Sequence, residues 1–252
     1  MPYIELDGIS TYYEVHGAGI PVLLLHGGFC SIETLRHQIR HLEPSYEVHA
    51  PERPGQGRTP DRDGPIGFDG MVRDTLAYLD ALDIPAAHVV GFSDGAIVGL
   101  LLARDHGDRV LSLVSISANL DPTGFVDDED TSATAVGPAA GSLSPDRFRE
   151  AYDRLSPDGP AHGDVVMEKL ASMWQAEPQI DAASLATVRA PTLVLAGQHD
   201  SIRTDHTLAI ARAIPGAQVA IVPGAGHTVM EERPEVVNLL LTDFLTAVTA
   251  AS

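Results

Sequence analysis

The sequence has little cysteine and few basic residues. Cys30 is the only cysteine, so no intrachain disulfide can form, and this fits a reducing, cytoplasmic compartment. Sixteen Lys and Arg stand against 35 Asp and Glu, which gives a formal net charge of −19 at pH 7. Nucleic acids and anionic membranes are bound through basic patches, so neither is an expected partner.

Signals of membrane insertion, secretion and cofactor binding are missing as well. No stretch approaches about 18 consecutive apolar residues, and the N-terminal MPYIELDG has no basic region followed by an apolar run. The histidines are scattered along the chain, and their spacing does not suggest a metal site. The glycine-rich stretches GAGIP and RPGQGR match no phosphate-binding pattern. We therefore expect no metal, no cofactor and no membrane anchor.

The chain does contain a repeating alternation of strand-like and helix-like segments. Its 252 residues, 44% of them hydrophobic, are enough for one large core with a small accessory part. Such an alternation is typical of a mostly parallel sheet with helices on both faces. The eight expected strands lie at residues 3–6, 11–15, 21–25, 46–50, 88–90, 110–116, 192–196 and 219–222, and the expected helices at 34–42, 68–82, 93 onward, 205–213 and 234–248.

The alternation fails after the sixth expected strand. Residues 121–146 are loop-rich, and only 146–155 and 164–176 have helical patterns before the next strand begins. We interpret 119–187 as a small, mainly helical cap inserted into a core formed by 1–118 and 188–252.

One short stretch, HVVGFSDGAIVGL at 88–100, points to chemistry. A β-branched apolar strand runs into Gly-Phe-Ser-Asp-Gly and then into an apolar helix. Glycines flank Ser93 because side chains would clash in so tight a turn. A serine at such a strand-to-helix turn is strained, exposed and close to the positive end of a helix, which suits a nucleophile.

Polar residues follow several of the other expected strands. They are His26-Gly27-Gly28-Phe29, Glu52-Arg53, Gln198-His199-Asp200 and Gly226-His227. In an open parallel sheet the carboxyl ends of the strands share one edge, so we expect these residues to gather around Ser93. A serine hydroxyl needs a base, which His227 can be, and a carboxylate to orient that base, which Asp200 can be.

Taken together, LLLHGG, PERPGQGRT, VVGFSDGA, PTLVLAGQHD and IVPGAGHTVMEERPE resemble the motifs of the α/β-hydrolase fold superfamily. The resemblance covers the core almost end to end and omits the insertion. It implies Ser93 as nucleophile, His227 as base and Asp200 as orienting acid. It also implies an oxyanion hole formed by the backbone N–H groups of Asp94 and of Gly28, with Phe29 as the alternative to Gly28.

Asp94 is an unusual residue to follow the nucleophile. FSDGA resembles the WSDGG elbow of valacyclovir-hydrolase-like members of this fold, in which the resemblance implies that the Asp receives a substrate amino group. A carboxylate beside an oxyanion hole is costly unless a positive group pairs with it. That group is either a substrate ammonium or an internal arginine such as Arg53.

Further substrate contacts are expected from aromatic residues near the elbow. Phe29 and Phe92 flank the nucleophile loop, and Trp174 belongs to a helical pattern of the cap that either packs on the core or lines the pocket. Cys30 is either a packing residue or part of that pocket.

The function that these residues predict is serine hydrolysis of a carboxylic ester, lactone or thioester. C–C bond hydrolysis and cofactor-free perhydrolase or haloperoxidase chemistry use the same triad and stay open, as does a non-catalytic ligand receptor on this scaffold. The partner is expected to be a small ester-type molecule, and the chain a monomer or homodimer.

Overall fold

The computed structural model describes residues 2–126 and 146–251. Eight strands form one sheet in the order β1-β2-β4-β3-β5-β6-β7-β8. β1 and β2 are antiparallel to their neighbours, whereas β4, β3 and β5 through β8 are parallel. The strands are β1 (Tyr3–Leu6), β2 (Ile9–Gly17), β3 (Pro21–Leu25), β4 (Glu47–Pro51), β5 (Ala87–Phe92), β6 (Val110–Ile116), β7 (Thr192–Gly197) and β8 (Gln218–Val222). The expected eight-stranded, mostly parallel sheet is confirmed.

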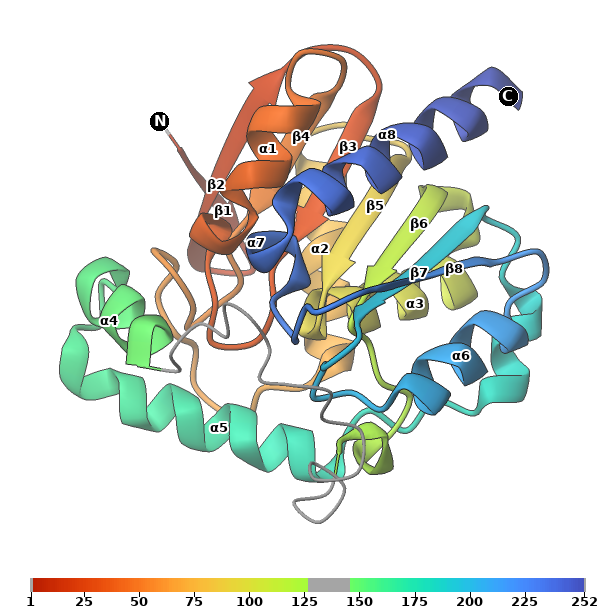
Figure 1. Cartoon of the computed structure of the whole chain (residues 1–252). Coiled ribbons are helices and arrows are strands. Elements are labelled where there is room, and N and C mark those ends of the chain that lie inside the picture. The colour runs from red at the N-terminus through yellow and green to blue at the C-terminus, as the bar shows by residue number, and fades with distance from the viewer. Residues whose placement is uncertain (1, 127–145, 252) are drawn as a thin grey trace.

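Helices lie on both faces of this sheet. The α-helices are α1 (Arg36–Leu42), α2 (Phe68–Ala81), α3 (Asp94–Asp105), α4 (Asp146–Leu155), α5 (Gly163–Ala176), α6 (Thr204–Ala213), α7 (Val229–Glu232) and α8 (Pro234–Ala251). Short 3-10 turns occur at η1 (Ile32–Leu35), η2 (Gly107–Arg109), η3 (Pro122–Gly124), η5 (Pro160–His162) and η6 (Ala182–Thr187). Figure 1 shows α1 and α8 over one face, and α2 and α3 behind the other.

The central strands are buried on both faces because their apolar runs alternate between two cores. In β3, Val22 packs into the core under α1 and α8, whereas Leu23 packs into the core under α2 and α3. Val89 and Val90 of β5 divide in the same way. A continuous apolar run is what such a doubly covered parallel strand needs.

The helices α4 and α5, from the expected cap, lie at the carboxyl ends of the parallel strands (Figure 1). α5 is tied to the core by Lys169, the only lysine of the sequence, whose Nζ donates to Asp61 at 2.6 Å. η6 packs against α3 and α6. Residues 127–145 of the expected cap lie outside the described residues, and the boundaries at 118/119 and 187/188 stay predictions.

Candidate active site

Ser93 stands at the sharp turn between β5 and α3. Its φ is +51° and its ψ is −119°, a conformation that costs a non-glycine residue about 1–3 kcal/mol. The turn is possible because two glycines replace side chains: a Cβ on Gly91 would collide with the Gly95 carbonyl, and a Cβ on Gly95 with the Leu25 carbonyl. The Ser93 amide donates to the Ile116 carbonyl at 2.8 Å, which anchors the turn to β6.

His227 links this serine to a carboxylate. Its Nε2 lies 3.1 Å from the Oγ of Ser93, and its Nδ1 lies 2.7 Å from Oδ1 of Asp200. Asp200 follows β7, and His227 lies in the loop between β8 and α7. The structure therefore brings together three side chains that the sequence spreads over 135 positions, from 93 to 227.

The environment of Asp200 keeps it charged. Burial raises the pKa of Asp200. This rise is outweighed by the His227 ring, the Ser117 hydroxyl and the Ile202 amide, so that the pKa lies below its ordinary value. For His227, burial lowers the pKa, but the charge and hydrogen bond of Asp200 raise it above the ordinary value. An ionised acid that raises the basicity of its histidine is what a general base requires.

Ser117 belongs to this group, although it is not among the residues predicted from the sequence. Its Oγ donates to Oδ2 of Asp200 at 2.5 Å, and its φ is +59°. The signal was available, because Ser117 directly follows β6 at the same edge of the sheet as the other polar residues.

The His26–Phe29 loop packs directly against the elbow. A Cβ on Gly27 would lie 2.8 Å from the Phe92 ring and 3.2 Å from Cβ of Ser93. Gly28 is covered by the Asp94 carboxylate and the Trp174 ring, both of which a Cβ would strike. Phe29 has a φ of +51° and stacks on Tyr152 of α4 with ring centroids 5.1 Å apart.

Asp94 has an internal hydrogen-bond partner in Trp174, and the arginine that the sequence suggested, Arg53, acts on it through charge without a direct ion pair in the described structure. The indole Nε1 of Trp174 donates to its Oδ1 at 2.9 Å, whereas Oδ2 is buried without a hydrogen-bond partner in the described structure. No ion pair between Asp94 and Arg53 forms within the described residues. Burial raises the pKa of Asp94, and the nearby Arg53 charge, the Trp174 hydrogen bond and His227 oppose the rise.

Phe92, the aromatic residue that precedes the nucleophile, is buried. Its side chain is only 1% exposed. It packs beneath the His227 ring, with centroids 5.1 Å apart. Phe92 therefore supports the imidazole of His227, and its contact with a substrate stays a prediction.

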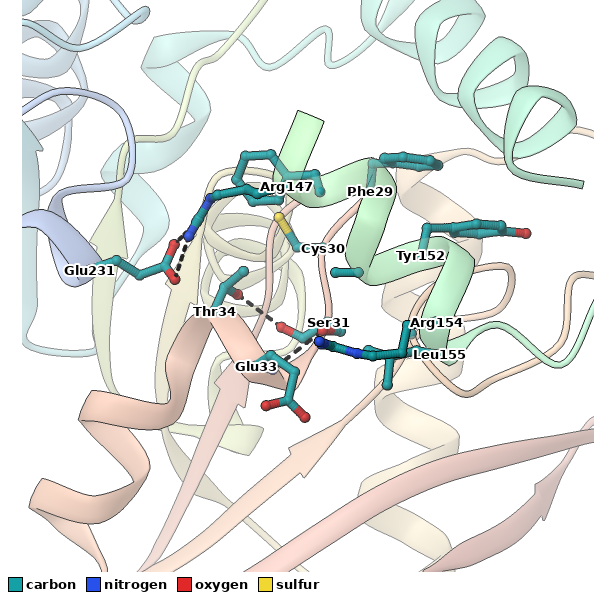
Figure 2. Close-up of a pocket in the computed structure, with 13 residues that line it drawn as sticks. Phe29, Cys30, Ser31, Glu33, Thr34, Arg147, Tyr152, Arg154, Leu155 and Glu231 are labelled. Atoms are coloured by element: carbon teal, nitrogen blue, oxygen red, sulfur yellow. Dashed lines mark hydrogen bonds and ion pairs between the residues drawn. The ribbon is translucent and has the colours of Figure 1, made fainter. Parts of the chain in front are cut away.

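A cavity of about 180 Å³ lies beside the loop that carries Phe29 and Cys30. Figure 2 shows α4 forming one wall through Arg147 and Tyr152, with Arg147 paired to Glu231. Burial raises the pKa of the Cys30 thiol to about 12, so this wall residue is a neutral thiol. Ser93, Asp200 and His227 do not line the cavity.

The described residues contain neither a membrane-spanning helix nor a cluster of metal ligands. No helix among them has the length and apolar character of a membrane span. No group of three or more His, Cys, Asp and Glu side chains among them is arranged to hold a metal ion.

Comparisons with known proteins identify relatives of this chain. A family model described as "Alpha/beta hydrolase family" matches residues 22–238. A putative carbamate hydrolase (RutD) of Azorhizobium caulinodans is 29% identical, over 97% of this chain and 98% of its own. A putative non-heme bromoperoxidase (BpoC) of Mycobacterium tuberculosis is also 29% identical, over 96% of this chain and 100% of its own.

Solved structures have the same architecture. A hydrolase from Pseudomonas aeruginosa matches with a TM-score of 0.75 and 26% identity, over 95% of each chain. An N-acyl homoserine lactone degrading enzyme matches with a TM-score of 0.80 and 24% identity, over 96% of this chain and 100% of its own, a likeness in fold.

Proposed function

Because the chain belongs to the alpha/beta hydrolase family, we propose that it is a serine hydrolase that cleaves a carboxylic ester, a lactone or a thioester. The observation that supports this best is the contact of one imidazole with both the Ser93 hydroxyl and the Asp200 carboxylate. A serine activated in this way attacks carbonyl carbons.

In the first half-reaction, Oγ of Ser93 adds to the substrate carbonyl while Nε2 of His227 takes its proton. The negative charge that develops on the carbonyl oxygen is held by the backbone N–H groups of Gly28 and Asp94. One such donor typically contributes about 3–4 kcal/mol to the transition state. His227 then gives its proton to the leaving alcohol or thiol, and the acyl group stays on Ser93.

In the second half-reaction, water replaces the leaving group. Nε2 of His227 takes a proton from this water, whose oxygen adds to the acyl carbon, and the proton returns to Oγ of Ser93 as the acid leaves. Asp200 accepts the Nδ1–H throughout, which fixes the tautomer with a free Nε2 and stabilises the imidazolium.

We assign substrate contacts to the elements around Gly28. Residues 119–187 act as a cap, from which Trp174 covers the oxyanion loop. Phe29 and the neighbouring cavity receive the apolar part of the substrate, and Oδ2 of Asp94 accepts a substrate N–H. Phe92 packs against His227 and supports its ring.

The proposed function is tested with p-nitrophenyl esters of short acids. Ser93→Ala is expected to lose at least about 10³-fold in kcat/KM, whereas Ser115→Ala, which removes a buried hydroxyl from β6, keeps full activity. A fluorophosphonate should label the wild-type protein and not the Ser93 variant. Equal turnover by wild type and Ser93→Ala would refute the proposal, and absence of any turnover would favour the receptor alternative.

A second candidate, carbamate hydrolysis, is favoured by the relatives. Two putative carbamate hydrolases align over nearly the whole chain at 29% and 30% identity. A carbamate presents a carbonyl to the same serine, so the residue roles are unchanged. The similarity to a putative non-heme bromoperoxidase supports perhydrolase chemistry as an alternative. A panel of ester, lactone, thioester and carbamate substrates, with a peroxide-dependent bromination assay, ranks these activities by kcat/KM.

The role of Asp94 is tested with aminoacyl and alkyl esters of one alcohol. If Oδ2 accepts a substrate ammonium, Asp94→Asn should reduce kcat/KM for the aminoacyl ester at least about 10-fold more than for the alkyl ester, since a charge-assisted hydrogen bond contributes about 1.5–3 kcal/mol. An unchanged ranking of the two esters would contradict this role.

A further inference from the structure

Arg53 lies beneath the proposed oxyanion hole, and the proposed mechanism leaves it unused. We propose that Arg53 is a positioning residue, which aims the N–H of Gly28 at the developing oxyanion and offsets the Asp94 charge beside it. The inference rests on the proposed function, because it concerns the oxyanion of that reaction.

The surroundings of Arg53 are unusual for a buried arginine. It is 5% exposed, and it takes part in none of the ion pairs found within the described residues. Its Nη2 donates to the Gly27 carbonyl at 2.8 Å, while Nε and Nη1 are buried without a partner there. Burying an unpaired guanidinium costs several kcal/mol, so fold stability alone is a poor reason for this placement.

His26 holds the same carbonyl from a second direction. Its Nε2 accepts the backbone N–H of Arg53 at 3.2 Å, so the ring proton is on Nδ1, which donates to the Gly27 carbonyl at 2.8 Å. Burial, and then the Arg53 charge, keep the pKa of His26 well below its ordinary value, so the ring is neutral. Two donors therefore hold the Gly27 oxygen.

Holding that oxygen determines the direction of the catalytic donor. The Gly27 carbonyl and the Gly28 N–H belong to one planar trans peptide and point in opposite directions. Donors on the carbonyl also polarise the peptide, which strengthens the hydrogen bond that its N–H makes.

The Arg53 charge matters because of Asp94. That carboxylate is 2% exposed, covers Gly28, and has one oxygen without a partner in the described structure. A buried anion in this place repels the negative charge of the transition state, and the nearby cation offsets that repulsion.

The test compares Arg53→Met with Arg53→Lys, on a p-nitrophenyl ester and on an aryl trifluoromethyl ketone. The ketone carbon accepts Oγ of Ser93, which leaves an alkoxide in the oxyanion hole. Because removing a direct donor costs about 10²–10³-fold, we expect Arg53→Met to lower kcat about 10–100-fold with KM within about threefold, and to weaken ketone binding by a similar factor. Arg53→Lys should fall between Met and wild type.

A matched control is Arg109→Met. The Arg109 guanidinium also donates to backbone carbonyls, those of Ile84 and Pro85, but at the amino ends of the strands, so its loss should leave kcat and ketone affinity unchanged. Asp94→Asn in the Arg53→Met background should restore kcat at least about threefold, since it removes the unbalanced charge. Lack of recovery would overturn the charge part of the proposal.

The proposal as a whole is overturned if Arg53→Met keeps kcat within threefold, or if only KM and thermal stability change. Should the Met variant not fold, Arg53→Lys carries the test, and wild-type kcat with wild-type ketone affinity in that variant overturns it. These results differ from failure of the proposed function, in which Ser93→Ala itself stays active.

Discussion

The indole N–H of Trp174 donates a hydrogen bond to the carboxylate of Asp94, across the 80 positions that separate α5 from the nucleophile elbow. This bond joins the proposed cap to the residue that follows the nucleophile, and it places an aromatic ring directly over Gly28.

Trp174→Phe should destabilise the protein, because it removes the one hydrogen bond that the Asp94 carboxylate accepts within the described residues. We expect the free energy of unfolding to fall by about 1–3 kcal/mol, measured by urea denaturation. In an Asp94→Leu background, Trp174→Phe should change the free energy of unfolding very little, since no acceptor is left for the indole. A Trp174→Phe variant as stable as wild type would show that the bond contributes nothing.

The pH dependence of kcat/KM should follow the His227 imidazole. His227 must be neutral to take the Ser93 proton, and its pKa is raised above the ordinary value of about 6.5. Activity is therefore expected above this raised pKa and should fall as the pH drops through it. Asp200→Asn removes the charge that raises the pKa, so its acidic limb should move to lower pH, while kcat falls by about 10⁴-fold. If the acidic limb of the Asp200→Asn profile stays at the wild-type pH, a group other than His227 titrates there.

Ser117→Ala should weaken catalysis without abolishing it. The Ser117 hydroxyl lowers the pKa of Asp200 and fixes one of its oxygens, so its loss should reduce kcat/KM about 10-fold, the effect of about 1.4 kcal/mol. Ser115→Ala is the matched control, since Ser115 lies two residues before Ser117, in β6, and its buried Oγ has no partner in the described structure. Equal activity of the two variants would remove Ser117 from the site.

Much of the fold follows from local patterns. Each expected strand is present. The central strands β3, β5, β6 and β7 were predictable because a doubly covered strand needs an apolar run that is visible without tertiary information. Boundaries were less accurate: the strand expected at 88–90 extends over Ala87–Phe92, since the flanking Ala, Gly and Phe also pair with β6. The helix α7 was missed because its four residues are too few for helical periodicity.

The sequence predicted the triad residues, which lie in recognisable motifs, but not the packing around them. Ser93, Asp200 and His227 each follow a strand, so the sheet topology alone places them at one edge. The partner of Asp94 was not predictable, because it depends on how α5 packs over the elbow. The burial of Phe92 was missed for the same reason, since position beside the nucleophile does not determine on which side a ring packs.

Ser93→Gly tests whether the elbow stores backbone strain for function. With a φ of +51° and a ψ of −119°, Ser93 adopts a conformation that glycine reaches without a steric penalty. Ser93→Ala removes the hydroxyl but keeps the Cβ, so the two variants differ mainly in that penalty. Both should be inactive, and the glycine variant should be the more stable by about 1 kcal/mol, after allowing for the greater freedom of glycine in the unfolded chain. Chemical denaturation of the two variants measures this difference. A glycine variant less stable than the alanine variant would mean that the turn is relaxed, and that the hydroxyl is held in position by its neighbours rather than by a strained backbone.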